Sequence, residues 1–257
     1  MNVQRIPAVI IQTPNSERFL PLFEVICKSE VFEPVLIVAT MGYSLSGENE
    51  EFIQEEVLRY RRVLTQNERA CAVSHSEARN VIAQSQHGGI VFEDDARVID
   101  LEHLEQAALS FLAKFSNMSS ALGLLDYKNQ HVEGCTDNTP LRFRKLLAET
   151  PLAVATVLTP IAASEILKSA STSSQTADWP KSKCRFFILS DGCVRHGDTT
   201  SGSVIGDTAM RVSGKTPHLF SPHSLSSTYH RFLQKLDTIL IPYYQPKCPF
   251  CPISATI

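Results

Sequence analysis

Apolar runs alternate with segments of helical periodicity along much of the chain. Four short apolar runs predict β-strands at 8–11, 34–39, 90–92 and 121–125. The second run has no polar residue, which is typical of a strand buried on both faces of a parallel sheet. Helices are predicted between and after these strands, one ending near residue 26 and others spanning roughly 48–60, 65 to the glycine pair at 88, 101–115 and 160–170. This alternation predicts an α/β fold with a mostly parallel central sheet.

The helix that begins near residue 65 has the clearest signals in the sequence. Thr65 and Glu68 form a capping-box pattern, in which each side chain bonds the backbone N–H of the other residue. The residues that then recur at steps of three and four, and predict one inward face, are Cys71, His75, Ala78 and Ile82. The glycine pair at 88–89 is expected to end this helix before the next strand.

Composition and charge are those of an ordinary globular protein. The 257 residues, 43% of them hydrophobic and 20% charged, suit one large domain with a sizeable core. A net charge of −3 argues against a general nucleic-acid-binding protein, which normally has a basic face. The N-terminus lacks a secretory-signal pattern, and no apolar run reaches the length of about 18 residues that a membrane span needs. Because the seven cysteines form no spaced framework, we expect a cytoplasmic protein, with peripheral attachment to the inner face of the membrane left open.

The third predicted strand ends in three consecutive carboxylates, Glu93, Asp94 and Asp95. Ligands of open α/β sheets bind beyond the carboxyl ends of the strands, so these acids are expected at a ligand-binding edge. Adjacent carboxylates repel one another, and a hard divalent cation would supply counter-charge while also binding diphosphate oxygens. A solvated acidic turn is the alternative interpretation. The strongly apolar strand directly before the acids favours the metal site.

Two segments resemble the hallmark of glycosyltransferase family 25, which includes lipooligosaccharide β-galactosyltransferases and collagen galactosyltransferases. Residues 64–75 have the pattern Leu-Thr-x-x-Glu-x-x-Cys-x-x-Ser-His, and residues 90–96 are an apolar strand ending in Glu-Asp-Asp. Weaker similarity extends over roughly residues 8–205. The chain departs from the family pattern where Arg69-Ala70 replaces Ile-Gly and where Val157 replaces a common tyrosine, which bears on the acceptor.

This resemblance implies a GT-A-type fold over residues 1–205, with residues 206–257 as an extension of unknown function. It also implies a UDP-sugar donor, a requirement for Mn²⁺ or another divalent cation, and inversion at the anomeric carbon. Asp95 would be the principal metal ligand, Asp94 would assist it or hold the donor ribose, and Glu93 would support the cluster. His196 could complete the metal shell from a distal loop, although a surface histidine is the alternative.

Inversion needs a general base that deprotonates the acceptor hydroxyl, and a carboxylate is the usual choice. Asp178 is the first candidate, because the neighbouring Trp179 offers a stacking surface for a sugar. A turn aspartate beside a packed tryptophan is the alternative interpretation. Asp126, at the end of a predicted core strand, is the second candidate for the base.

Other residues are candidates for binding the nucleotide donor. Gln12, Thr13 and Arg18 follow the first strand, where the base and diphosphate should lie, and Arg18 could pair with phosphate oxygens. Ser74 and His75 are expected either to brace the acidic loop or to contact the donor, with an ordinary core histidine as the alternative. 

One cysteine pair stands apart from these candidates. Cys248 and Cys251 form a single C-x-x-C near the end of the sequence, without the regularly spaced partners that a zinc site needs. We therefore assign them no function.

The resemblance thus implies an inverting hexosyltransferase that moves a hexose, with galactose as the first candidate, from a UDP-sugar to a glycan or glycolipid hydroxyl. A lipopolysaccharide-type surface glycan suits a chain without a secretory signal better than an acceptor in the secretory pathway. Two other classes stay open, a sugar nucleotidyltransferase and a catalytically silent module that binds a nucleotide or a glycan.

Overall fold

The structure, a computed structural model, describes residues 5–45, 50–60, 63–115, 120–126, 143–145, 154–170, 176–177, 180, 182–189 and 191–197. Its centre is a seven-stranded sheet in the order β2-β1-β3-β7-β5-β8-β6. Its strands are β1 (Ile6–Gln12), β2 (Phe32–Val38), β3 (Gly89–Glu93), β5 (Ala121–Leu124), β6 (Phe143–Lys145), β7 (Ala155–Leu158) and β8 (Arg185–Leu189). A two-stranded ribbon pairs β4 (Ala96–Val98) with β9 (Val194–His196). The helices are α1 (Leu20–Ile26), η1 (Gly42–Ser44), α2 (Glu50–Tyr60), α3 (Gln66–Gln84), α4 (Leu101–Phe115) and α5 (Pro160–Ala170).

The central sheet is mixed, but most of its strands run in one direction. Strands β1, β2 and β3 are mutually parallel. Strand β7 is antiparallel to both β3 and β5, so β5 runs with the first three strands, and β8 is parallel to β5. Strand β6 is antiparallel to β8. The predicted α/β fold with a mostly parallel sheet is therefore confirmed at this level.

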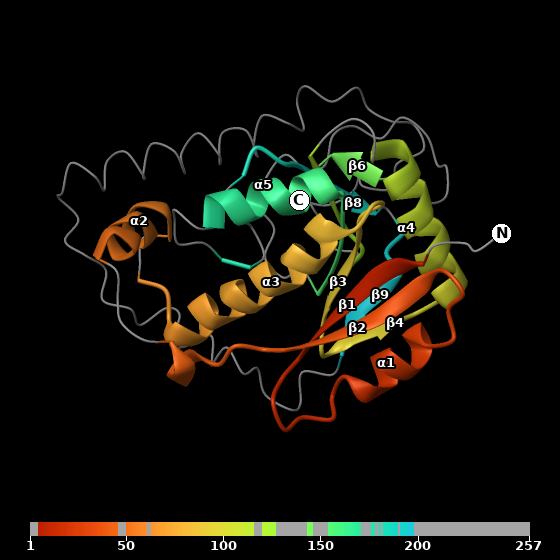
Figure 1. The fold of residues 1–257 in the computed structure, drawn as a ribbon, viewed down its shortest axis with the longest axis horizontal. Coiled ribbons are helices and arrows are strands. Elements are labelled where there is room, and N and C mark those ends of the chain that lie inside the picture. The colour runs from red at the N-terminus through yellow and green to blue at the C-terminus, as the bar shows by residue number, and fades with distance from the viewer. Residues whose placement is uncertain are drawn as a thin grey trace, which may run out of the picture.

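Helices cover both faces of the sheet, because buried strand residues alternate between the faces. In β1, Ile6, Ala8 and Ile10 pack with residues of α1 and α4, whereas Val9 and Ile11 pack with residues of α3 and α5. Figure 1 shows α3 and α5 side by side in front of the strands, and α1 and α4 at the other side of the sheet. The result is a three-layer arrangement with a core on each side of the sheet.

Strand β2 differs from the prediction of a strand buried on both faces. Leu36 is 41% exposed and Val38 is 63% exposed. The reason is its position, because β2 is the terminal strand in the sheet order and the helical layers cover it only in part. An entirely apolar run therefore does not distinguish a central strand from one at the margin.

Helix α3 begins as the sequence predicts but ends earlier. Thr65 Oγ1 accepts from the Glu68 N–H at 3.2 Å, and Glu68 Oε2 accepts from the Thr65 N–H at 2.9 Å, so the capping box is present. The helix ends at Gln84, before the glycine pair at 88–89. Gly88 has φ of 94°, and a Cβ there would lie 2.3 Å from the Leu158 carbonyl oxygen. The pair thus permits the turn into β3 and its close approach to β7.

A buried ion pair joins α2 to the first turn of α3. Glu56 is fully buried and accepts two hydrogen bonds from Arg69, from Nε to Oε1 and from Nη2 to Oε2, each at 2.8 Å. The backbone N–H of Leu64 donates to the same carboxylate at 2.8 Å. Arg69 lies at one of the positions where the sequence departs from the glycosyltransferase pattern that it resembles, and here it joins α3 to α2.

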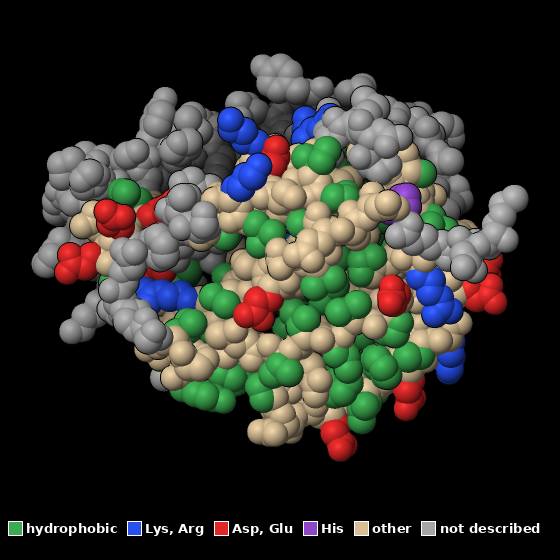
Figure 2. Space-filling view, in the orientation of Figure 1, with side chains coloured by type: hydrophobic (Ala, Val, Ile, Leu, Met, Phe, Trp, Pro, Cys, Tyr) green, Lys and Arg blue, Asp and Glu red, His purple; other side chains and the backbone are tan. Residues whose placement is uncertain are grey.

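The described surface carries charges of both signs. On the face shown in Figure 2, the coloured Lys and Arg side chains are interspersed with Asp and Glu and form no continuous basic patch. Among the described helices, none is both long enough and apolar enough to cross a membrane. The proposed extension 206–257, with Cys248 and Cys251, lies outside the described residues.

Candidate functional site

The acidic triplet lies at the edge of the sheet where the strand order reverses. Strand β1 has β2 on one side and β3 on the other, and the carboxyl ends of all three lie at the same edge. Ile11 is opposite Glu93, so Gln12 and Thr13 continue from β1 next to the acids. In parallel α/β sheets such a reversal forms a crevice that binds ligands.

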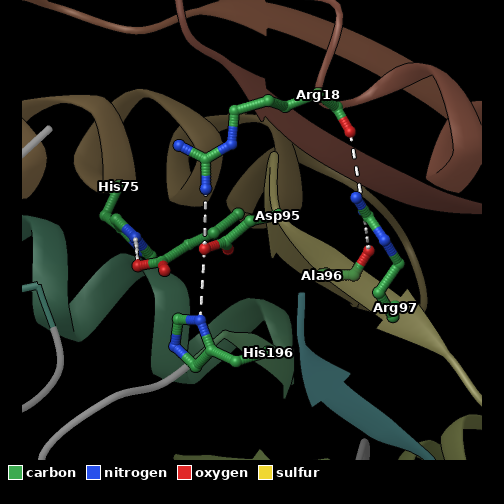
Figure 3. A network of polar contacts seen from close by, with 7 residues as sticks. Arg18, His75, Asp95, Ala96, Arg97 and His196 are labelled. Carbon is green, nitrogen blue, oxygen red and sulfur yellow. Dashed lines mark hydrogen bonds and ion pairs between the residues drawn. The ribbon is translucent and has the colours of Figure 1, made fainter. Parts of the chain in front are cut away.

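Asp95 is held between two basic side chains from distant segments. Its Oδ2 lies 3.0 Å from Arg18 Nη2 and 3.2 Å from His196 Nδ1. Figure 3 shows the guanidinium and the imidazole approaching this carboxylate from opposite sides. The structure therefore brings together Arg18, Asp95 and His196, which the sequence analysis proposed separately for phosphate and metal binding.

The turn after β1 places Arg18. The Ser16 N–H donates to the Thr13 carbonyl at 3.2 Å, and Asn15 has a positive φ of 58°, which asparagine tolerates better than most residues. The Ser16 hydroxyl then accepts from the Arg18 N–H at 3.3 Å. Arg97 Nη1 donates to the Arg18 carbonyl at 3.5 Å and ties this turn to β4 (Figure 3). Arg97 was missed in the sequence analysis, because a single arginine carries no pattern that predicts such a contact.

The β4–β9 ribbon places His196. Ala96, directly after the acidic triplet, pairs with His196 in antiparallel register. The Gly197 N–H donates to the Asp95 carbonyl at 2.7 Å, and a Cβ on Gly197 would lie 2.6 Å from that oxygen. Glycine is therefore required at 197 for this close approach. Gly197 was not a predicted site residue, although it directly follows His196 in the sequence.

Two carboxylate oxygens of the cluster are buried and accept no hydrogen bond from the described residues. They are Asp94 Oδ2 and Asp95 Oδ1. Buried polar atoms normally have a partner, so these two oxygens are suited to a ligand that supplies positive charge. Oxygen donors beside a histidine fit a divalent cation such as Mn²⁺. The protein itself supplies part of the counter-charge, since Asp95 also pairs with Arg18 and His196.

Glu93 faces a different partner from its two neighbours. His75 is 2% exposed, and its Nε2 lies 3.3 Å from Glu93 Oε1. The Ser74 hydroxyl donates to the Ala70 carbonyl and accepts from the Thr40 N–H, each at 2.9 Å. The contact of His75 suits the bracing role, because it joins α3 to the end of β3. Ser74 instead fixes the segment after β2, and neither of these two hydrogen bonds is with the acidic loop.

The charge state of Asp95 follows from its surroundings. Burial alone would raise its pKa, but the hydrogen bond and charge of His196, together with the charge of Arg18, outweigh burial. The pKa of Asp95 therefore lies below its ordinary value of 3.8. This carboxylate stays ionised, as a metal ligand must be, at any physiological pH.

We expect the pairing of Asp95 to stabilise the metal-free protein in a pH-dependent way. A lowered folded-state pKa stabilises the fold above pH 3.8, and this contribution is lost as the pH falls through the folded value. In urea unfolding with chelator present, Asp95→Asn should therefore be less stable than the unmodified protein near pH 7, with the difference shrinking below pH 3.8. Glu33→Gln, at an exposed carboxylate, serves as the control. A difference that stayed constant down to pH 3 would contradict the assigned ion pairs.

The two candidate bases differ in how far the structure describes them. Asp126 follows β5 at the same edge of the sheet, is 7% exposed and forms a parallel bridge with Val194, two residues before His196. Asp178 and Trp179 lie outside the described residues. The carbonyl of Ala177 accepts from Arg79 Nη2 at 2.7 Å, which fixes the chain directly before Asp178 against α3.

No model of a known protein family matches the chain, and no curated protein matches it significantly. The resemblance to glycosyltransferase family 25 accordingly depends on residues 64–75 and 90–96, with weaker similarity around them.

Proposed function

We propose that this protein is a metal-dependent, inverting glycosyltransferase with a GT-A-type fold. In this proposal it transfers a hexose, with galactose as the first candidate, from a UDP-sugar to a hydroxyl of a glycan or glycolipid. The observation that carries the proposal is the pair of buried carboxylate oxygens on Asp94 and Asp95, which accept no hydrogen bond from the described part of the chain and lie at the reversal of strand order.

The arrangement and the charges of the side chains at this edge of the sheet support binding of a diphosphate-containing ligand. A divalent cation held by Asp94, Asp95 and His196 would neutralise charge on a departing nucleoside diphosphate. Arg18, beside Asp95, offers a guanidinium fork that matches phosphate oxygens. Gln12 and Thr13 continue from β1 beside these residues and are the proposed contacts for the nucleotide.

The acceptor hydroxyl needs a carboxylate to take its proton as the glycosidic bond forms. Asp178 stays the first proposed base and Asp126 the second. Asp126 is mostly buried, so as a base it would require an acceptor that reaches into the edge of the sheet between β5 and β9. A surface glycan built at the cytoplasmic face of a membrane is the proposed acceptor.

A thermal-shift screen of nucleotide sugars with and without Mn²⁺ tests donor class and metal together. At a ligand concentration of about 100 times Kd, binding adds about 2.7 kcal/mol of stability, which corresponds to a rise in Tm of roughly 5–11 °C for a protein of this size. We expect that rise with a UDP-sugar plus Mn²⁺, and its loss in Asp95→Asn. Stabilisation by other nucleotide sugars alone would contradict the proposed donor.

Two activity assays separate the other function classes. Slow hydrolysis of the UDP-sugar without acceptor is expected of a transferase, whereas a silent binding module leaves the donor intact. Release of pyrophosphate from a nucleoside triphosphate and a sugar phosphate would identify a nucleotidyltransferase instead.

A further inference from the structure

Three side chains with metal-binding atoms converge between α3 and the end of β3. They are Cys71, His75 and Glu93, and one ligand atom from each lies within 4.8 Å of the other two. Cys71 and His75 are four residues apart, so they lie on one face of α3, one turn from each other. Glu93 is the last residue of β3 and meets this helical face.

The geometry of the cluster is close to that of a zinc site. Zinc–ligand bonds of about 2.0–2.3 Å place the tetrahedral nitrogen, oxygen and sulfur ligand atoms about 3.3–3.6 Å apart. His75 Nε2 and Glu93 Oε1 are 3.3 Å apart, which already matches this spacing. The remaining separations, up to 4.8 Å, need a displacement of about 1 Å, which rotation of the Cys71 or Glu93 side chain can supply.

The surroundings hold this cluster in place. His75 is buried, while Cys71 and Glu93 are partly exposed, so an ion has access from solvent. The hydrogen bonds of Ser74 to Ala70 and Thr40 fix the helical turn that carries His75. All three side chains thus lie on regular elements of the core, two on a helix and one on a central strand.

The donor set differs in kind from the neighbouring oxygen site. A thiolate, an imidazole and a carboxylate favour Zn²⁺ or Co²⁺, whereas the oxygens of Asp94 and Asp95 favour harder cations such as Mn²⁺. Residues of the same acidic triplet therefore face two chemically distinct environments. Glu93 lies near Cys71 and His75, whereas Asp95 lies near Arg18 and His196.

We propose that Cys71, His75 and Glu93 form a zinc site that fastens α3 to the end of β3. Three protein ligands leave the fourth tetrahedral position to water, and binding releases the thiol proton of Cys71. This proposal does not depend on the glycosyltransferase function, because it rests on a separate set of side chains.

Cobalt is the spectroscopic probe for the test, because a thiolate–cobalt bond gives a charge-transfer band that oxygen ligands do not give. The test uses the 257-residue chain with the substitutions Cys248→Ser and Cys251→Ser, because these two closely spaced thiols could bind Co²⁺ themselves. After chelation and reduction, titration with Co²⁺ should produce this band with one equivalent bound, and Zn²⁺ but not Mn²⁺ should displace the cobalt. Zn²⁺ should also raise Tm.

Single substitutions in that background locate the site. Cys71→Ser should abolish the charge-transfer band, and Glu93→Gln should weaken Co²⁺ binding by at least about tenfold. Cys27→Ser, at an exposed cysteine after α1, and Asp95→Asn should each keep the band. Absence of the band from the background protein, or its survival in Cys71→Ser, would overturn the proposal. Loss of the band in Asp95→Asn would show that Co²⁺ binding also needs Asp95, and would refute a zinc site that is separate from the proposed manganese site.

Discussion

Asp95→Ala is expected to reduce Mn²⁺-dependent sugar transfer by at least about 100-fold, because a catalytic metal contributes several kcal/mol to the transition state. The substitution removes one oxygen that has no hydrogen-bond partner among the described residues and another that holds both Arg18 and His196. It therefore affects the proposed metal and phosphate contacts together. Initial rates with a UDP-sugar over a range of Mn²⁺ concentrations measure the effect.

The matched control for this experiment is Glu33→Ala. Glu33 is an exposed carboxylate near the start of β2, at the opposite end of the strand from the acidic triplet. It should keep the activity of the unmodified protein. Circular dichroism should show that both variants are folded, because Asp95 lies at the edge of the sheet and not in its core. Unchanged turnover in Asp95→Ala would remove the metal assignment.

Arg69→Met is expected to destabilise the fold by about 3 kcal/mol, which lowers Tm by roughly 6–12 °C. The fully buried carboxylate of Glu56 loses both charge-assisted hydrogen bonds, since Arg69 supplies each of them. Removing one partner of a buried ion pair takes away counter-charge from the other, which costs more than the pair itself contributes. Urea unfolding measures the free energy directly.

The double variant Glu56→Gln/Arg69→Met tests whether the buried charge of Glu56 causes this loss of stability. The glutamine carbonyl can still accept from the Leu64 N–H, as Glu56 does at 2.8 Å, but the buried carboxylate charge is removed. We expect the double variant to recover most of the lost stability. If it is as unstable as Arg69→Met, lost packing of the long arginine side chain accounts for the effect.

Local patterns predicted the elements whose signals lie within one segment. The capping box of Thr65 and Glu68 defined the start of α3, and the proline at 160 marked the start of α5. Asp100 caps α4 in the same local way, with its Oδ1 accepting from the His103 N–H at 3.1 Å. These features depend on residues a few positions apart, so the sequence displays them directly.

Pairings between distant segments were not predictable in the same way. Strands β4, β6 and β9 have three residues each, too few for a hydrophobic period to emerge. Strand β8 is apolar and five residues long, but it follows a segment with weak signals and was also missed. Only partners far along the chain, such as β5 for β8, define these strands.

The candidate site shows the same difference between local signals and contacts of distant segments. The acidic triplet was recognisable because its three members are adjacent and follow an apolar strand. The pairing of Asp95 with Arg18 spans 77 positions, and its pairing with His196 spans 101. A single sequence contains no local signal for such contacts, although it did present each residue as a separate candidate.

Strand β9 is translated long after the acidic triplet, and this order has a consequence for biosynthesis. At synthesis rates of about 5–20 residues per second, the 101 residues between Asp95 and His196 take about 5–20 s to be translated. During that interval the nascent chain already carries the three acids, yet it lacks the histidine and the Gly197 contact that close one wall around them. If the proposed cation binds here, a cation captured at this stage would be weakly held, and selective binding would require translation of β9.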